Sequence, residues 1–367
     1  MKTLKISIKT LKNKSQENPV KTGFLHLFYL LVCLISACPV MAQYSLKPLD
    51  SAAYRIGEGV EKDSVSFRGL SVVNNKVIWV SGSRGTIARS NDKGKHFELI
   101  QLKGYEKSDF RDIEGFDEKK AIVMSSGSPA YILKTIDGGV TWKEVFKSED
   151  TLIFLDAMDF WDDKKGLVIG DPLNGRFFMM NTTDAGENWK LLDSSKAPSA
   201  KVGEALFAAS GTCLRCWNKN MYGFVTGGSD ARLFIYKRWK KKMITPIPIV
   251  HGNPGQGAYS FTVSDDTYNC VGGDFGESDR KVNLVSWHKD AGIFGAALDS
   301  LPGYRSCVEG TGERCMEIVT GPNGTDLYNC GDIKRISKIG FHVVKKAKRG
   351  KVIYLAGSKG RIALLKD

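Results

Sequence analysis

Three short segments of the chain repeat one pattern at a nearly constant interval. They read SNDKGKHF at 90–97, TIDGGVTW at 135–142 and TTDAGENW at 182–189, and all fit Ser/Thr-x-Asp-x-Gly-x-x-aromatic. The sequence between the copies has the alternating apolar pattern and strand-end glycines of short β-strands. A period in the forties that carries such strands is typical of the blades of a β-propeller.

Strand-end glycines continue the repeat where the Asp motif is lost. They follow apolar strands at Gly82, Gly127 and Gly170, and again within 225–229, 270–274, 319–325 and 355–361. The sequence therefore predicts an all-β fold, a seven-bladed propeller of four-stranded antiparallel blades within one domain at 43–367. Six blades with extensions are the alternative count. The last unit supplies only three strands, so we expect a segment near 52–59 to complete it, closing the ring between the N- and C-terminal strands.

The aspartates of the repeat are expected to be structural. The motif falls between the third and fourth strands of a unit, where glycine accepts a positive φ and an Asp side chain can bond to the turn backbone. Asp92, Asp137 and Asp184 would then lie on the outer rim in three different blades. Groups so far apart cannot share one reaction.

The N-terminal residues 1–42 are predicted to be a signal peptide. Lysines precede an apolar run at 23–38, which is too short for a confident membrane span. One processing site lies before Gln43, and a competing lipoprotein-like site would attach a lipid to Cys38. In both cases the mature protein is exported, to the periplasm, the cell surface or the medium. No later segment is apolar for long enough to span a membrane.

Other sequence features do not point to a metal, a cofactor or nucleic acid. The basic run KRWKKK at 237–242 could meet nucleic acid or anionic lipid, but lysines are also typical of a solvated hairpin edge. No nucleotide or metalloprotease motif occurs, and one CxxC without a second ligand pair is a weak zinc signal. An even number of cysteines in an exported domain permits disulfides, but spacing leaves the pairing open. The six are Cys213, Cys216, Cys270, Cys307, Cys315 and Cys330.

The quoted repeats resemble the Asp-box, or BNR, repeat. With the stretches SGSRGTIARSNDKGKHF and SGSPAYILKTIDGGVTW, the chain is similar over about 60–365 to the photosystem II stability/assembly factor family and its exported bacterial relatives. That resemblance implies a propeller that binds or scaffolds a protein partner. Asp-box repeats also occur in sialidases and in non-enzymatic receptors, so the resemblance does not decide whether the protein is an enzyme.

Polar residues recur near the start of each predicted first strand, the strand that lines the channel of a propeller. These strands begin at 67–71, 110–114, 154–158, 203–207, 258–262, 304–308 and 340–344. The polar residues are Arg68, Arg111, Asp112, Asp156, Glu204, Tyr259, Ser260, Arg305, Ser306 and His342. Asp171 and Asp274 follow second strands and are weaker candidates for the channel mouth.

Three interpretations of this polar level remain open. It is a self-satisfied ring of ion pairs, or a site where Arg68, Arg111 and Arg305, with His342, bind an anionic or sugar-like ligand or a protein tail. The third interpretation rests on similarity to sialidases, which implies Tyr259 with Glu204 as nucleophile and Asp112 or Asp156 as acid/base in a glycosidase. The sialidase FRIP stretch is only half matched at Phe67 and Phe110. We therefore favour an exported binding or assembly module, with the hydrolase as the alternative.

Overall fold

The computed structural model describes residues 44–49, 54–56, 61–282, 284–296 and 301–366. Residues 44–366 form one compact unit. The predicted signal peptide at 1–42, its cleavage site and Cys38 lie outside the described residues. Within the described part of the chain, no helix is long and apolar enough to cross a membrane.

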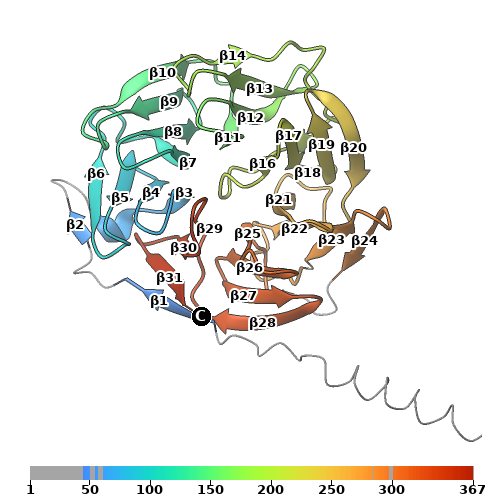
Figure 1. Ribbon diagram of the computed structural model, residues 1–367. Coiled ribbons are helices and arrows are strands. Elements are labelled where there is room, and N and C mark those ends of the chain that lie inside the picture. Colours follow the sequence, from blue (N-terminus) through green and yellow to red (C-terminus); the bar gives the residue numbers. More distant parts are fainter. Residues whose placement is uncertain (1–43, 50–53, 57–60, 283, 297–300, 367) are drawn as a thin grey trace, which may run out of the picture. The chain divides into compact units, whose positions relative to one another are not determined.

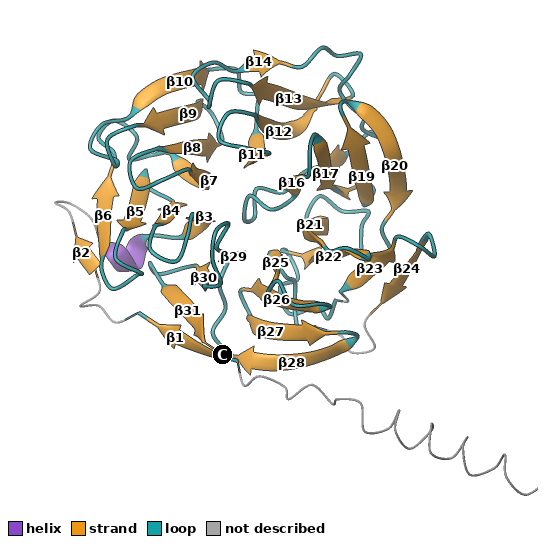
Figure 2. Cartoon of the chain, viewed as in Figure 1, coloured by secondary structure: helices purple, strands orange, loops and turns teal. Residues whose placement is uncertain are grey.

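Seven antiparallel sheets are arranged in a ring around a central channel, so the prediction of an all-β, seven-bladed propeller is confirmed (Figure 1). Figure 2 shows that strands and loops make up almost all of the ring, with one short helical turn, η2 (Lys62–Ser64). We number the blades along the chain from the first complete sheet. In each of them the first strand lies innermost and the last lies on the rim.

The first four blades have the following strands. Blade 1 contains β3 (Phe67–Val72), β4 (Ile78–Gly82), β5 (Thr86–Ser90) and β6 (Phe97–Gln101). Blade 2 contains β7 (Asp109–Gly115), β8 (Ala121–Ser126), β9 (Ala130–Thr135) and β10 (Lys143–Ser148). Blade 3 contains β11 (Leu155–Phe160), β12 (Gly166–Leu173), β13 (Arg176–Thr182) and β14 (Lys190–Leu191). Blade 4 contains β16 (Leu214–Trp217), β17 (Met221–Val225), β19 (Arg232–Lys237) and β20 (Lys240–Pro246).

The remaining three blades complete the ring. Blade 5 contains β21 (Gln256–Val263), β22 (Thr267–Asp274), β23 (Val285–His288) and β24 (Ile293–Ala296). Blade 6 contains β25 (Cys307–Gly310), β26 (Met316–Gly321), β27 (Gly324–Asn329) and β28 (Asp332–Ser337). Blade 7 contains β29 (Val343–Lys346), β30 (Ile353–Ala356) and β31 (Ile362–Lys366), with β1 (Ser45–Pro48).

The N-terminal strand closes the ring, but it is not the strand that the sequence predicted. β1 pairs antiparallel with β31, from Ser45 opposite Lys366 to Pro48 opposite Ala363. The predicted closing segment near 52–59 instead contains β2 (Tyr54–Ile56), which pairs parallel with β6 at the rim of blade 1. Closure by β1 gives blade 7 four strands, as in blade 6, whereas β2 adds a fifth strand to the sheet of blade 1.

Blade 4 departs from the regular pattern, and the predicted first strand at 203–207 is wrong. Glu204 and Ala205 form the two-residue strand β15, which pairs with β18 (Gly227–Gly228) in the sheet of blade 5. The innermost strand of blade 4 is β16, which begins at Leu214. The residues between β15 and β16 therefore leave the sheets altogether.

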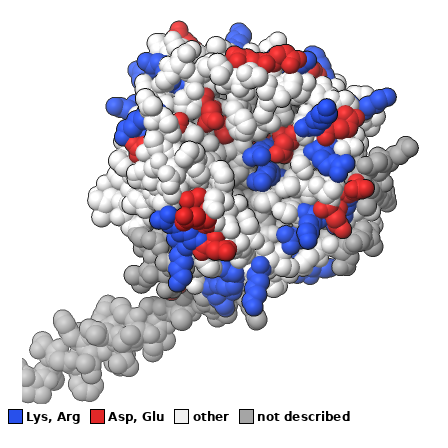
Figure 3. All heavy atoms as spheres, turned by 180° about the vertical axis from the view of Figure 1, so that it is seen from behind, with Lys and Arg blue, Asp and Glu red and all other residues white. Residues whose placement is uncertain are grey.

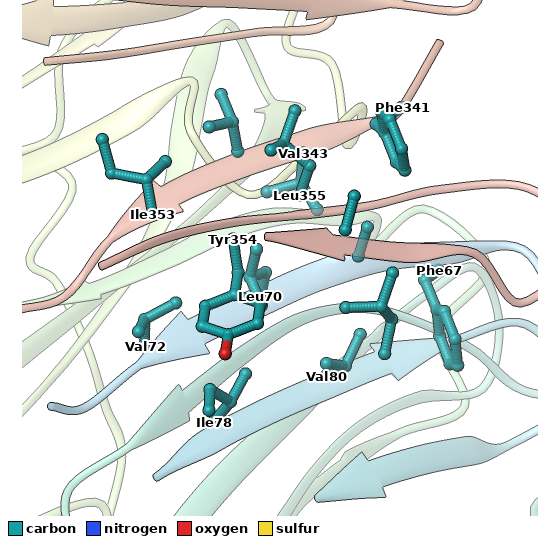
Figure 4. Packing of buried hydrophobic residues seen from close by; sticks show 14 of the residues in the cluster. Phe67, Leu70, Val72, Ile78, Val80, Phe341, Val343, Ile353, Tyr354 and Leu355 are labelled. Atoms are coloured by element: carbon teal, nitrogen blue, oxygen red, sulfur yellow. The ribbon is translucent and has the colours of Figure 1, made fainter. Parts of the chain in front are cut away.

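Apolar side chains pack between neighbouring blades and hold the ring closed. Figure 4 shows this packing where the last blade meets the first: Phe67, Leu70 and Val80 face Phe341, Val343 and Leu355. All six side chains are almost fully buried. Burying apolar surface of this kind stabilises the folded state by about 25 cal/mol per Å². The junction between blades 1 and 7 is therefore part of the hydrophobic core.

The three Asp motifs form tight turns on the rim. Asp92 Oδ1 accepts a hydrogen bond from Ser90 Oγ at 2.9 Å and one from the His96 N–H at 3.0 Å. Asp137 and Asp184 repeat this geometry, each bonded to the hydroxyl two residues before it and to the N–H four residues after it. These bonds lower the pKa of each carboxyl to about 2. In Asp92, burial opposes the shift, but the hydrogen bonds outweigh it. The carboxylates therefore hold the β5–β6, β9–β10 and β13–β14 turns.

Candidate functional site

A β-bulge lies at the same place in the innermost strands of four blades. The register shifts between Phe67 and Gly69, between Phe110 and Asp112, between Leu155 and Ala157, and between Ala258 and Ser260. The residues left unpaired are Arg68, Arg111, Asp156 and Tyr259. A bulge turns a side chain out of the regular alternation of its strand, and bulges are frequent beside functional sites.

The bulges in blades 1 and 2 bring Arg68 and Arg111 together at one end of the channel. The positive charge of Arg111 lowers the pKa of Arg68, after the larger effect of burial. Arg111 Nε donates to Asp109 Oδ2 at 2.8 Å, and Arg111 Nη1 donates to the Ala208 carbonyl at 3.3 Å. Arg68 Nη1 donates to the Ala209 carbonyl at 3.4 Å. Both arginines are half-buried.

The carbonyls that the arginines contact belong to a segment that crosses the channel, residues 206–212, here called the plug segment. Ser210 Oγ donates to the Ser306 carbonyl of blade 6 at 2.8 Å, and Thr212 Oγ1 donates to Ser260 Oγ of blade 5 at 2.6 Å. Gly211 lies so close to blade 2 that a Cβ there would be 2.3 Å from Asp112 Cγ. Contacts with blades 1, 2, 5 and 6 mean that the plug segment fills the channel below the arginines.

His342 lies beside the two arginines, on the approach to β29. Its ring is buried, and Nε2 lies 2.8 Å from Ser358 Oγ. Burial and the nearby positive charges of Arg68, Arg111 and Arg361 lower its pKa to about 3. His342 is thus a neutral polar group next to the positively charged end of the channel.

The structure does not bring Arg305 to this cluster, so the expectation of three arginines around one anion is wrong. The Arg305 side chain is fully buried, and its Nε and Nη2 donate to Asp326 Oδ2 at 3.1 and 2.6 Å. Its Nη1 donates to the carbonyls of Pro302, Gly303 and Tyr304. These contacts hold the guanidinium inside blade 6, out of reach of a ligand at the channel end.

The structure also separates the two residues that sialidase similarity would pair. Glu204 accepts hydrogen bonds from Arg232 Nε at 2.8 Å and from Thr226 Oγ1 at 2.6 Å. The Tyr259 hydroxyl donates to the Gly255 carbonyl and accepts from the Phe275 N–H at 3.0 Å. Tyr259 and Glu204 are each held by other groups, so the predicted nucleophile pair is not formed.

The two candidate acids are buried beneath the plug segment and are not at a surface. Asp112 Oδ1 accepts from the Ile113 N–H at 2.9 Å and Oδ2 from the Met158 N–H at 2.8 Å, a bridge between blades 2 and 3. Asp156 is fully buried, close to Arg111 and to the backbone N–H groups of Ala208 and Asp171. Burial raises the pKa of both groups well above the usual range. Neither is placed to protonate a ligand at the channel end.

The weaker candidates at the ends of second strands hold loops. Asp171 Oδ1 accepts from the Leu206 N–H at 2.9 Å and so anchors the start of the plug segment. Asp274 accepts from Gln256 Nε2 at 2.9 Å and from the Gly276 N–H at 2.8 Å. Burial raises the pKa of Asp171, whereas hydrogen bonds led by that of Gln256 lower the pKa of Asp274.

The opposite end of the channel contains a cavity of about 390 Å³ lined by residues of all seven blades. Its lining carries five acidic and five basic side chains, and ion pairs join some of them. Arg215 Nη2 donates to Glu309 Oε2 at 2.7 Å, and Lys348 Nζ bonds to Glu114. These ion pairs stabilise the end of the channel opposite to the one where Arg68 and Arg111 lie.

The outer surface carries charges of both signs. On the face shown in Figure 3, lysine and arginine side chains lie among aspartates and glutamates. The run at 237–242 spans the turn between β19 and β20, and Lys240, Lys241 and Lys242 are exposed on β20, the rim strand of blade 4. That position agrees with the hairpin-edge interpretation. Among the described residues, no group of three His, Cys, Asp or Glu side chains is placed to hold a metal ion.

The fold and the channel define a class of protein: a closed seven-bladed β-propeller whose channel is filled by its own chain and capped at one end by arginines. Two solved structures similar to the chain are both YCF48. One is "YCF48 bound to D1 peptide", with TM-score 0.60, 12% identity and coverage of 89% of this chain and 97% of that chain. The other is YCF48 from Cyanidioschyzon merolae, with TM-score 0.61, 13% identity and coverage of 87% and 98%. No family model and no curated protein matches the sequence.

Sequence reasoning missed the groups that the arginines contact. Asp109 directly precedes the FRDIE stretch, so its place beside Arg111 could have been inferred from the strand itself. The plug segment gave a weaker signal in the sequence. The stretch of chain from the inner strand of blade 3 to that of blade 4 is longer than the regular repeat. Nothing local to the sequence indicates that the backbone carbonyls of Ala208 and Ala209 face the channel.

Proposed function

We propose that the protein is a binding module that captures a carboxylate-bearing segment of a partner protein at the channel end formed by Arg68 and Arg111. The observation that carries this proposal is the pair of half-buried guanidinium groups that the two bulges hold side by side. Such a site suits a role in assembling or holding another protein, as the resemblance of the repeats implies.

The arginines have hydrogen-bond donors to spare. A guanidinium carries five N–H donors, and among the described residues Arg68 donates one hydrogen bond and Arg111 donates two. The bonds to the plug segment are long, at 3.3 and 3.4 Å. A carboxylate could take paired donors from either group, which is the strongest common form of arginine recognition.

Electrostatics favour an anion at this end. Arg68 and Arg111 carry two like charges, and among the described residues Asp109 is the one carboxylate that forms an ion pair with them. Asp156 also lies near Arg111, but burial raises its pKa, which favours its neutral form, so an excess of positive charge remains. A bound carboxylate would offset the repulsion between Arg68 and Arg111. The opposite channel end offers no such excess, because its lining carries five acidic and five basic side chains, with two ion pairs among them.

A protein segment is the preferred class of ligand because one YCF48 structure of similar fold was solved with a peptide bound. A glycosidase is not proposed, since Tyr259 and Glu204 are engaged with other groups. We further propose that the chain is exported, with cleavage before Gln43 or lipid attachment at Cys38. Mass analysis of the mature N-terminus distinguishes these two, and an uncleaved N-terminus would contradict both.

A comparison of two forms of each peptide tests the site: one form has a free C-terminal carboxylate and the other has a C-terminal amide. We expect peptides that bind with a free C-terminal carboxylate to bind at least about tenfold more weakly once that carboxylate is an amide. The same carboxylate peptides should bind Arg68→Gln and Arg111→Gln at least about tenfold more weakly than the wild type, because charge-assisted bonds contribute about 1.5–3 kcal/mol. Arg314→Gln is the matched control, since Arg314 is exposed on the edge of blade 6. Equal binding of acid and amide forms, or of all variants, would overturn the proposal.

A further inference from the structure

Two cysteines lie next to each other at adjacent turns of blade 6. Cys315 directly precedes β26, and Cys330 directly follows β27, the strand that pairs with β26. The last pair of that ladder is Met316 with Asn329, and the Cys330 N–H donates to the Cys315 carbonyl at 2.9 Å just beyond it. The two thiols also influence each other, since Cys315 is the leading cause of the raised pKa of Cys330.

Both cysteines occupy backbone conformations that cysteine rarely adopts. Cys315 has φ 55° and Cys330 has φ 47°, in the left-handed region where glycine or asparagine costs least. Cys330 with Gly331 forms the two-residue turn between β27 and β28. Two unfavourable placements of the same residue type, side by side, indicate that the thiols themselves are used.

The other four described cysteines lack such a partner. Cys213, Cys270 and Cys307 are buried. Cys307 Sγ contacts the Val344 carbonyl at 3.4 Å, and Cys216 Sγ contacts the Asp159 carbonyl at 3.7 Å. Only Cys315 and Cys330 combine mutual contact with access to solvent among the cysteines that the structure describes.

We propose that Cys315 and Cys330 are a modification site that closes to an intramolecular disulfide on contact with a disulfide oxidant such as glutathione disulfide. One thiolate attacks the oxidant, releasing one reduced thiol, and the second cysteine displaces the other. A protein S–S bond forms, the oxidant's S–S bond breaks, and the two protons and two electrons leave with the two product thiols. The predicted export would supply the oxidising surroundings in which such a bond persists.

The thiol pair is expected to react slowly near neutral pH. The hydrogen bond from Cys315, together with burial and the charge of Glu317, raises the pKa of Cys330 to about 11, with Arg314 opposing. Because the thiolate is the attacking form, oxidation should speed up as the pH rises. Tyr328 also lies near the pair; burial raises its pKa, and Glu317, Cys315 and Cys330 add to the rise.

Peptide mapping tests the proposal directly. Trypsin cuts after Arg314 and Lys334, so both cysteines fall in one peptide, 315–334, with no other cysteine. Reduced protein is equilibrated with excess glutathione disulfide in mildly alkaline buffer, quenched in acid, and alkylated in denaturant. We expect peptide 315–334 to be lighter by two hydrogen atoms and free of alkyl groups, while the four other cysteines of 44–366 are alkylated.

Cleavage before Asp326 separates the two cysteines and shows whether a bond joins them. The fragments should stay linked until they are reduced. In Cys315→Ser, Cys330 should instead carry glutathione or the alkylating group, whereas the control Cys216→Ser should still form the 315–330 link. Full alkylation of both cysteines after oxidation, or a link from either one to another cysteine, would overturn the proposal.

Discussion

Arg305 and Asp326 form a charged pair in the interior of blade 6, with both side chains excluded from solvent. Arg335 Nε also donates to Asp326, at 2.5 Å to the second carboxylate oxygen. One carboxylate thus pairs with two guanidinium groups, one of them with no exposed surface. This arrangement explains why Arg305, although it follows the same sequence pattern as Arg68, is absent from the channel end.

Removal of the carboxylate should destabilise the propeller strongly. We expect Asp326→Ala to lower the free energy of unfolding by about 3–5 kcal/mol, because it leaves a buried positive charge without a partner. Urea unfolding measures the difference. Asp266→Ala, which breaks the exposed pair with Arg314, is the control and should cost less than about 1 kcal/mol. Similar costs for the two variants would mean that the buried pair is dispensable.

Gly211 tests how tightly the plug segment fits the channel. A Cβ at this position would lie 2.3 Å from Asp112 Cγ, and the residue has φ +67°. We expect Gly211→Ala to lower the free energy of unfolding by about 2–4 kcal/mol, as overpacking adds to the backbone cost. Gly104→Ala isolates the backbone cost, since Gly104 has φ +88° and open space around it. Equal losses in both variants would show that the channel accommodates the methyl group.

The rim turns should make stability sensitive to acid. Asp92, Asp137 and Asp184 have folded-state pKa values of about 2, below the ordinary 3.8. A depressed carboxyl pKa contributes stability that is complete above about pH 4 and lost as the pH falls toward about 2. Melting temperatures of the wild type and the triple Asp→Asn variant should therefore converge on acidification through that window. A constant difference between them would rule out this linkage.

His342 should act over a higher pH range. Its folded-state pKa is about 3, against an ordinary 6.5, because burial and three nearby arginines disfavour the charged ring. The unfolded chain binds the proton more readily, so stability falls as the pH drops from about 6.5 toward about 3. We expect His342→Leu to flatten the pH dependence of the melting temperature between about pH 6.5 and 4, and the exposed His251→Gln to leave it unchanged. A wild-type slope in His342→Leu would contradict the assignment.

The regular parts of the fold could be predicted because each blade repeats the same local chemistry. The Ser/Thr, Asp and Gly of each motif make the same turn in three blades, so their spacing measured the repeat correctly. From that spacing, the innermost strands at Phe67, Phe110 and Leu155 follow directly. The FR pair in two successive blades is enough, from the sequence alone, to indicate Arg68 and Arg111 as neighbours at the channel.

The errors arose where the chain leaves its repeat. The stretch at 203–207 has the composition of a strand, but tertiary contacts take the following residues across the channel, and Leu214 begins the true inner strand. Arg305 was misplaced because sequence order cannot show that Asp326, a residue of a different strand, captures its side chain. The sequence favours 52–59 as the closing strand because the four residues Ser45–Pro48 carry little pattern of their own.

The pairing of β1 with β31 has a consequence for how the protein is made. Ser45 lies opposite Lys366, so the last blade is built from the two ends of the described chain (Figure 1). Blades 1 to 6 can form in order as the polypeptide emerges, since their strands are neighbours in sequence. Blade 7 must wait for β31, and until then blades 1 and 6 each expose an apolar flank. Ring closure therefore follows the folding of the other six blades, and the waiting intermediate is the form most exposed to aggregation or to a chaperone.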